Sequence, residues 1–578
     1  MSNNSQTNQA APTYPAQVTG MWLLARSLAS VGIKSMFGLA GIPVTEVAYI
    51  CQQQGIRFVS FRHEQNAGMA AQTYGYLTKT PGVLLTVSSL GFLNGLSATI
   101  NATVNCYPMI QISGSSEREP IDLDQGPYEG LDQLAVARPL VKAAYRVNRA
   151  EDIPLAVARA YRAAVSGRPG GVYLDVTAPC LGQIIDRDKA EALLFDPVDP
   201  EPDMPPCRGA LGRAMKLLAS ARRPAFVIGK GAAYAQVENE LKELVDKTGI
   251  PYLAMSMAKG LLPDVAPLSA LSCRSTVMQK ADVVVLVGAR LNWLLSRGHG
   301  KWNPEVKFIQ LDIEPTEIDC NVPIAAPVIG DLCNTLRAML ATLPDYQLQI
   351  DPTWVPSLQA ETQAKAAKMQ ARLRDNATAS PMNHWTALGA IKPVIDANPD
   401  VIVVNEGANT LDDTRTALTM SLPRHRIDCA TWAIMGMGMG SAIGAAVATG
   451  KSVVAIEGDS AFGFSGIEFS TICRYRLPVT VVVFNNGGIY NGIGQNLSND
   501  GDPAPTTLNI NDRYDKLAEA FGGEPYYAAT PEQLTDALTR AIASRRPSLI
   551  HVQLAADSGQ ESGHIGFLNP ASLETIVV

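Results

Sequence analysis

The chain has 578 residues, of which 47% are hydrophobic and only 17% are charged, and its formal net charge is −7. An average globular protein is about 25% charged, so this composition excludes intrinsic disorder and predicts extensive apolar burial, some of it between subunits. Because no basic field exists over the chain as a whole, nucleic-acid binding is not expected.

The cysteines and the hydropathy pattern indicate the cellular compartment in which the protein is expected. The nine cysteines are scattered and form no C-x-x-C motif, which in a chain of this length predicts reduced thiols. The N-terminal residues lack the basic and apolar regions of a signal peptide. No apolar run approaches the roughly 18 residues of a membrane-spanning helix. We therefore expect a cytoplasmic protein without a membrane segment.

Apolar runs of strand length alternate with longer helical patterns along almost the whole chain. Continuous Val, Ile and Leu runs separated by helices are typical of parallel α/β sheets that are buried on both faces. In chain order, the expected strands lie at 35–41, 83–89, 109–113, 172–176, 225–229, 283–288, 308–312, 401–405, 453–458, 479–486 and 549–554.

Two breaks divide this pattern. The first, 195–207, is rich in proline and acidic residues and is predicted to be an extended linker. The second is the polar stretch 345–356, which leads into a helical pattern and then to Pro381. We therefore expect three α/β domains, each a doubly wound parallel sheet, at 1–195, 196–365 and 366–578.

The segment 453–492 carries the most informative motif. It predicts a strand ending at Asp459, a helix over 467–475 and a second strand ending at Asn486. Because the carboxyl ends of parallel strands meet at one edge of a sheet, these two side chains are expected to converge there. A carboxylate, an amide oxygen and a backbone carbonyl such as that of Gly488 form the all-oxygen partial shell that suits Mg²⁺.

The same segment resembles a known cofactor motif. The sequence G-D-S at 458–460, followed by 24 residues and then N-N, is similar to the thiamine diphosphate-binding motif. FRHEQ at 61–65 and TWAIMG at 431–436 resemble the superfamily's activating glutamate and the segment that bends the cofactor. With GFLNGL, YEGLDQ, AVSGRPGGVYLD, MSMAKG, NEGANTLD and ESGHIGFLNP, the resemblance extends from about residue 37 to 570 and points to the oxalyl-CoA decarboxylase family.

This resemblance implies a carboxy-lyase that uses thiamine diphosphate and Mg²⁺ to convert oxalyl-CoA to formyl-CoA and CO₂ in oxalate catabolism. The catalytic residues that it implies are Glu64, Tyr128, Glu129, Tyr490 and Ser562. The implied cofactor contacts are Ala408, Asn409, Ala433, Met435, Gly458, Asp459, Ser460, Asn486 and Tyr490. The implied metal ligands are Asp459, Asn486 and Gly488.

The resemblance also assigns two groups of residues to nucleotide ligands. For coenzyme A, the matched positions are Arg274 and Arg415, although solvated surface arginines are the simpler explanation. Guanidinium groups suit phosphate because they bind it in a bidentate manner. For ADP as an activator of the central domain, the matched positions are Arg168, Arg290, Asp312 and Asp331. A purely structural role in ion pairs is equally compatible with the two arginines of that group.

Several residues depart from the family pattern. Ser89 and Leu90 stand where the family usually has alanine and proline, Ala433 stands at a usual glycine, and Ser441 replaces a residue of its M-G-Y motif. These departures keep open a related 2-hydroxyacyl-CoA lyase, which yields formyl-CoA and an aldehyde or ketone. The ESGHIGFLNP tail favours the decarboxylase. A third interpretation, a non-catalytic scaffold or regulatory subunit, is disfavoured by the retained motif residues.

The family also implies an assembly. Its cofactor lies between the first domain of one subunit and the third domain of its partner. We therefore expect a homodimer as the minimum and a homotetramer as the complete protein, with an acyl-CoA as substrate.

Overall fold

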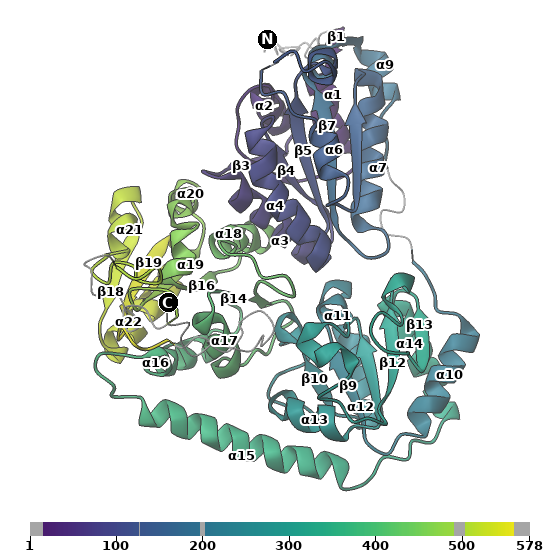
Figure 1. The fold of residues 1–578 in the computed structure, drawn as a ribbon, viewed down its shortest axis with the longest axis vertical. Coiled ribbons are helices and arrows are strands. Elements are labelled where there is room, and N and C mark those ends of the chain that lie inside the picture. Colours follow the sequence, from purple (N-terminus) through teal and green to yellow (C-terminus); the bar gives the residue numbers. More distant parts are fainter. Residues whose placement is uncertain (1–15, 127, 197–202, 491–502, 560–578) are drawn as a thin grey trace, which may run out of the picture. The chain divides into compact units, whose positions relative to one another are not determined.

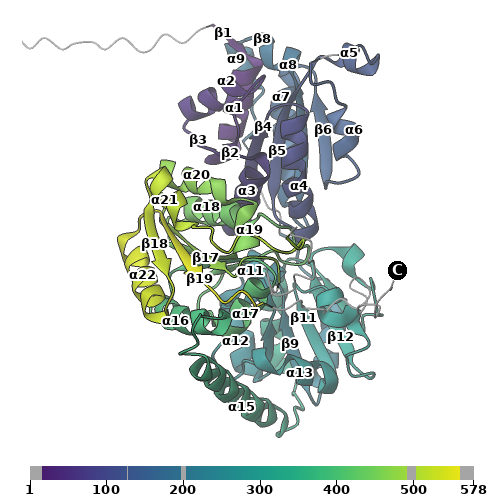
Figure 2. The same cartoon turned by 60° about the vertical axis from the view of Figure 1, so that its left-hand side comes forward.

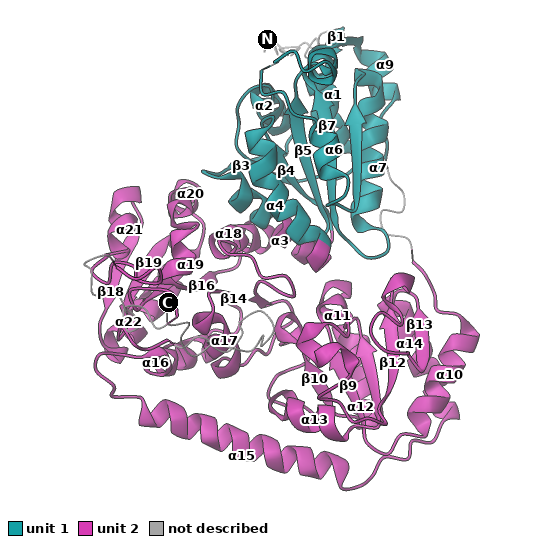
Figure 3. Cartoon of the chain, in the orientation of Figure 1, with its two compact units in different colours: residues 1–71, 80–103, 107–201 teal, residues 72–79, 104–106, 202–578 magenta. Residues whose placement is uncertain are grey.

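The computed structural model describes residues 16–126, 128–196, 203–490 and 503–559, which form three parallel sheets with flanking helices (Figure 1). This architecture confirms the expected fold class of three α/β sheets. The chain divides into two compact units (Figure 3): unit 1 comprises 1–71, 80–103 and 107–201, and unit 2 comprises 72–79, 104–106 and 202–578.

Unit 1 contains a six-stranded parallel sheet in the order β3-β2-β4-β5-β7-β6. Its strands are β2 (Ser35–Gly38), β3 (Arg57–Ser60), β4 (Gly82–Thr86), β5 (Met109–Ser115), β6 (Ala143–Val147) and β7 (Gly171–Thr177). A small antiparallel pair joins β1 (Gln17–Thr19) to β8 (Ile184–Asp186). The helices in this part of the sequence are α1 (Gly20–Ser30), α2 (Thr45–Gln53), α3 (Glu64–Thr78), α4 (Leu90–Asn105), α5 (Arg118–Asp122), α6 (Gln133–Ala137), α7 (Ile153–Val165), α8 (Ala178–Gly182) and α9 (Arg187–Ala192).

The second sheet belongs to unit 2 and has five parallel strands in the order β10-β9-β11-β12-β13. Its strands are β9 (Pro224–Ile228), β10 (Tyr252–Ala254), β11 (Val283–Val287), β12 (Lys307–Asp312) and β13 (Ala326–Ile329). Its helices are α10 (Arg208–Ala219), α11 (Lys230–Ala235), α12 (Glu238–Thr248), α13 (Arg274–Lys280), α14 (Leu332–Thr342) and the long α15 (Trp354–Asp375). A Cβ at Gly229 would lie 2.1 Å from the carbonyl oxygen of Gly288, so this glycine allows close packing of two loops.

The third sheet, also in unit 2, has six parallel strands in the order β15-β14-β16-β17-β19-β18. Figure 2 shows β17, β18 and β19 of this sheet. Its strands are β14 (Ile402–Glu406), β15 (Arg426–Ile427), β16 (Val453–Gly458), β17 (Val479–Asn485), β18 (Glu524–Ala528) and β19 (Ser548–Gln553). Every residue of β17 is buried, as expected for a β-branched run covered on both faces. The helices are α16 (His384–Asp396), α17 (Asn409–Ala417), α18 (Gly438–Thr449), α19 (Asp459–Gly463), α20 (Phe469–Arg474), α21 (Asp515–Phe521) and α22 (Pro531–Ser544).

Each strand expected from the apolar runs is present. The strands that the runs did not indicate, among them β3, β6, β15 and β18, lie at the sheet edges. The helix α15 continues across residue 365, so the boundary expected there falls within a helix. All nine cysteines are free thiols. Among the described residues, no helix is both long and apolar enough to cross a membrane.

Candidate cofactor and substrate site

Asp459 and Asn486 lie at the same edge of the third sheet. The strands β16 and β17 run parallel, and Gly458 pairs with Phe484 at the end of the ladder. Asp459 directly follows β16, and its carboxylate accepts hydrogen bonds from the backbone of the turn after β17. Its Oδ2 accepts the N–H groups of Gly487 at 2.8 Å and Gly488 at 3.0 Å.

The carboxylate of Asp459 is only 2% exposed. Burial raises its pKa to about 6, although backbone N–H groups, including that of Ser460 at 2.7 Å, lower it. Since burial outweighs these hydrogen bonds, the anion is incompletely compensated, and a cation at this edge would stabilise it. The residue is thus electrostatically suited to a divalent metal ion.

The donor set around Asp459 fits Mg²⁺ in combination with a ligand. The amide nitrogen of Asn486 donates to the carbonyl oxygen of Tyr490 at 2.8 Å, which fixes the orientation of the amide. One carboxylate and neutral oxygens suit Mg²⁺, which usually completes its shell with phosphate oxygens and water. Among the described residues, no group of three His, Cys, Asp or Glu side chains could hold a metal by itself.

The turn after β17 has a backbone conformation that requires glycine. Gly487 has φ +79°, and a Cβ there would lie 2.8 Å from the Cβ of Ile510. Glycine is therefore required for this turn. Tyr490, with φ +53°, ends the described part of the turn.

The turn after β14 lies beside this edge. Glu406 pairs with Glu457 in the parallel ladder, so Ala408 and Asn409 follow β14 where Asp459 follows β16. Ala408 is the N-cap residue of α17, and Asn409 is its first residue. Ala408 and Asn409, two of the cofactor contacts that the resemblance implies, thus follow the same edge of the sheet as Asp459.

The segment 429–435 contains Ala433 and Met435, and the backbone that directly follows it is anchored on a buried acid that was not among the predicted site residues. The carboxylate of Glu406 accepts the N–H groups of Gly436 and, at 2.5 Å, Gly438. Burial raises the pKa of Glu406 to about 7. Burial, followed by the charge of Glu406, raises the pKa of Glu457 well above its usual range.

The signal for these two acids was present in the sequence. Each is an acidic residue at the end of an apolar strand, in VIVVNE and VVAIEG. What could not be read from the sequence is that the two strands are neighbours in register, which places the acids side by side.

Glu64, the predicted acid–base residue, lies in unit 1. It is the first residue of α3 and is buried, and its Oε2 accepts a hydrogen bond from the amide nitrogen of Asn94 at 3.1 Å. A Cβ at Gly91 would lie 3.1 Å from the other carboxylate oxygen, so a small residue is favoured there. The carboxylate is therefore held in one place by the start of α4.

Tyr128 and Glu129 lie on a loop of the same unit. The side chain of Glu129 accepts a hydrogen bond from the hydroxyl of Ser88, and its carbonyl accepts one from the hydroxyl of Ser89. The residue that departs from the family at position 89 thus anchors a predicted catalytic residue. Tyr128 is exposed, and the adjacent charge of Glu129 raises its pKa. Ser562, the remaining predicted catalytic residue, lies outside the described residues.

The two arginines predicted to bind coenzyme A, Arg274 and Arg415, lie close enough for the charge of one to affect the pKa of the other. Burial, followed by the positive charge of Arg415, lowers the pKa of Arg274, the first residue of α13. Arg415, in α17, forms an ion pair with Asp412 at 2.5 Å. Two neighbouring guanidinium groups of this kind favour an anionic ligand.

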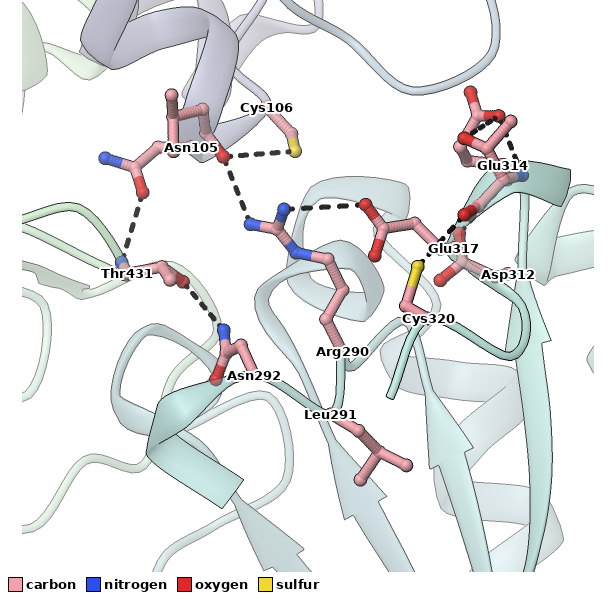
Figure 4. A network of polar contacts seen from close by, with 12 residues as sticks. Asn105, Cys106, Arg290, Leu291, Asn292, Asp312, Glu314, Glu317, Cys320 and Thr431 are labelled. Carbon is pink, nitrogen blue, oxygen red and sulfur yellow. Dashed lines mark hydrogen bonds and ion pairs between the residues drawn. The ribbon is translucent and has the colours of Figure 1, made fainter. Parts of the chain in front are cut away.

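The predicted ADP residues are only partly brought together. Arg290 lines a pocket of about 90 Å³ in unit 2, together with Asn292, Gln310, Glu317, Cys320 and Thr431. Figure 4 shows the polar contacts around Arg290 and Glu317. The guanidinium of Arg290 lies 3.7 Å from the carboxylate of Glu317. Asp312 accepts the N–H of Glu314 at 3.1 Å, and Asp331 caps α14 by accepting the N–H of Asn334. Arg168 follows α7 and belongs to unit 1.

Comparison with protein families accounts for all three sheets. Residues 18–136 match the thiamine pyrophosphate enzyme N-terminal TPP-binding domain, 211–339 match its central domain, and 408–552 match its C-terminal TPP-binding domain. Thiamine pyrophosphate is thiamine diphosphate. The chain belongs to the thiamine pyrophosphate enzyme family, as the motifs predicted.

Full-length relatives narrow the resemblance. The chain is 51% identical over 551 residues to oxalyl-CoA decarboxylase of Escherichia coli (strain K12), covering 95% of this chain and 97% of that one. It is 42% identical over 572 residues to 2-hydroxyacyl-CoA lyase of Arabidopsis thaliana, covering 96% and 99%. The human 2-hydroxyacyl-CoA lyase 1 is 35% identical over 577 residues, covering 96% and 98%. The predicted similarity to oxalyl-CoA decarboxylase is confirmed.

Proposed function

We propose that this protein catalyses the non-oxidative decarboxylation of oxalyl-CoA to formyl-CoA and CO₂ with thiamine diphosphate and Mg²⁺. The observation that carries the proposal is the 51% identity, along almost the whole chain, to an oxalyl-CoA decarboxylase. The lyases are more distant over a similar length. The buried Asp459 at the edge of the third sheet supports the cofactor assignment.

When bound, thiamine diphosphate supplies the electron sink for cleavage of a carbon–carbon bond. Asp459, Asn486 and the carbonyl of Gly488 would hold the metal ion, and the N–H groups of Gly487 and Gly488 would keep the Asp459 carboxylate in place. Glu64 would hold a proton at N1′ of the aminopyrimidine ring. Its bond from Asn94 at 3.1 Å orients the carboxylate for this task.

Residues on other loops would position the substrate. Tyr128, Glu129, Tyr490 and Ser562 would orient the oxalyl carboxylate and exclude water from the reacting carbon. The hydroxyls of Ser88 and Ser89 hold the backbone and side chain of Glu129, so its place is set before substrate binds. Such preorganisation lowers the cost of orienting the bond to be broken.

Arg274 and Arg415 would bind the phosphates of coenzyme A. Burial is the main reason that the pKa of Arg274 is lowered, and the charge of Arg415 lowers it further. An anionic ligand would compensate both effects. For ADP as an activator, the pocket at Arg290 is the candidate site. A phosphate there would replace the long ion pair between Arg290 and Glu317.

The alternative activity is that of a 2-hydroxyacyl-CoA lyase. It is favoured by the 42% identity to such a lyase and by the departures at Ser89 and Ala433. The two activities require the same cofactor contacts and differ in the group that leaves the acyl-CoA. We further propose a homodimer as the minimal assembly and a homotetramer as the complete one.

One experiment tests the activity. Purified protein is incubated with oxalyl-CoA or with a 2-hydroxyacyl-CoA, each with and without thiamine diphosphate and Mg²⁺, and the acyl-CoA products and CO₂ are quantified. We expect formyl-CoA and CO₂ from oxalyl-CoA only when both cofactors are present. Preferential cleavage of the hydroxyacyl substrate would establish the lyase instead. No cofactor-dependent turnover of either substrate would indicate a scaffold.

A further inference from the structure

Asn105, the last residue of α4, bonds to the segment 429–435 through every hydrogen-bonding group of its amide. Its Oδ1 accepts the N–H groups of Thr431 and Trp432, each at 3.1 Å. Its Nδ2 donates to the carbonyl oxygens of Cys429 at 3.3 Å and Trp432 at 3.4 Å. A primary amide has two donor hydrogens and two acceptor lone pairs, so these bonds use its full capacity. Asn105 is 1% exposed, so water does not compete for them.

The segment needs such support because it has little of its own. It is neither helix nor strand, so its N–H and C=O groups have no partners from regular secondary structure within the segment. Ala430 has φ +54°, a left-handed conformation that is unfavourable for alanine and is held by a hydrogen bond to Asp428 at 2.9 Å. Trp432 and Met435 are 44% and 38% exposed, so apolar packing contributes little to their positions.

Two residues from the part of unit 2 that contains the second sheet bind the C-terminal end of α4, where Asn105 lies, and one of them, Arg290, is shown in Figure 4. The carbonyl oxygen of Asn105 accepts a hydrogen bond from the ammonium of Lys230, and the carbonyl oxygen of Val104 accepts one from Arg290 at 3.1 Å. Cations at the C-terminal end of a helix are stabilised by the helix dipole. The segment receives a second support from the amide of Asn292, which donates to the hydroxyl of Thr431 at 3.3 Å.

We propose that Asn105 is a positioning residue that sets the backbone of the segment 429–435 before thiamine diphosphate binds. The inference rests on the proposed function and on the family resemblance, which implies that Ala433 and Met435 of this segment contact the cofactor. Asn105 acts through the backbone of Thr431 and Trp432 and contributes no atom to the reaction. Preorganising these contacts reduces the ordering that cofactor binding would otherwise require.

The test compares the wild type with Asn105→Ala and Asn105→Asp. Aspartate retains the acceptor for Thr431 and Trp432 but loses the donors to the carbonyl oxygens of Cys429 and Trp432. The matched control is Asn303→Ala, because Asn303 also accepts a backbone N–H, from Glu305 at 3.1 Å, and donates to a carbonyl, of Ala281 at 2.9 Å. Two quantities are measured: amide hydrogen exchange of residues 429–436 without cofactor, and calorimetric binding of thiamine diphosphate with Mg²⁺.

We expect a graded series from wild type through aspartate to alanine. Asn105→Ala should speed exchange at Thr431 and Trp432 and weaken cofactor binding by about tenfold, because the cost of ordering the segment then falls on the binding step. Asn303→Ala should change neither quantity. A flat series, or an equal effect of Asn303→Ala, would overturn the proposal. If the wild type bound no thiamine diphosphate, the proposed function would fail, while the exchange series would still decide whether Asn105 sets this backbone.

Discussion

Lys259 offers a sharp test of how the central part of unit 2 supports the third sheet. Its ammonium donates to the carbonyl oxygens of Arg415 and Leu418, each at 2.7 Å, at the end of α17. It also lies 3.3 Å from the carboxylate of Asp264. The two side chains are 3% and 0% exposed, so neither charge is solvated by water. We predict that Lys259→Met destabilises the protein and displaces Arg415.

The magnitude follows from what the substitution leaves behind. Removing one partner of a buried ion pair costs about 3–5 kcal/mol, because the remaining charge is uncompensated. Asp264 retains the N–H groups of Gly260 at 3.2 Å and Met420 at 2.8 Å, so we expect a loss near the lower end, about 3 kcal/mol. In Lys259→Met/Asp264→Asn the orphaned charge is absent, and at least half of the loss should be recovered.

The pH dependence gives an independent check. Burial lowers the pKa of Lys259 from 10.5 to about 8. The unfolded chain therefore holds a proton between about pH 8 and 10.5 that the folded chain has released, so wild-type stability rises with pH across this window. Lys259→Met lacks this contribution, and the difference from the wild type should widen by up to about 3 kcal/mol toward pH 10.5.

Urea unfolding followed by circular dichroism at pH 7 and pH 10 measures both effects, together with the KM for oxalyl-CoA. We expect a lower unfolding midpoint and a raised KM in Lys259→Met. Equal midpoints for Lys259→Met and wild type, or a double variant that is less stable than Lys259→Met, would refute the reasoning.

Three further predictions concern the candidate site. Glu64→Gln should abolish most decarboxylation without lowering the thermal midpoint, because it removes the acid–base group but keeps the side-chain shape; full activity in a steady-state assay would contradict the assignment. Asp459→Asn should lose the rise in thermal midpoint that Mg²⁺ and thiamine diphosphate together give the wild type, since ligand binding stabilises only a protein that binds. Ser89→Ala should reduce kcat/KM about fivefold through loss of one hydrogen bond to Glu129; unchanged kinetics would show that this anchor is dispensable.

Much of the fold could be predicted because each central strand is a short, continuous run of apolar residues that can be recognised from the local sequence alone. Runs such as VVVLV in β11 and VTVVVFN in β17 are buried in full, and hydrophobic runs of this length between helical patterns indicate buried parallel strands. Edge strands carry a weaker signal. The pattern of β18 alternates between exposed and half-buried residues before its final buried alanine, and β15 has only two residues.

The cofactor motif was equally accessible from sequence, and for a related reason. Asp459 and Asn486 are joined by one strand–helix–strand unit, whose right-handed parallel crossover returns both strand ends to the same edge. Local sequence is thus sufficient to bring these two side chains together.

The supports of the site were decided only by the tertiary structure. Asn105 and Thr431 are 326 positions apart, and Lys259 and Arg415 are 156 apart. Glu406 and Glu457 meet because β14 and β16 are neighbours in register. By itself, the sequence determined the α/β class and the thiamine diphosphate motif, since both are encoded by short-range hydrophobic and turn patterns. Contacts between distant segments depend on how helices and sheets pack, and no periodicity within one segment specifies a partner hundreds of residues away.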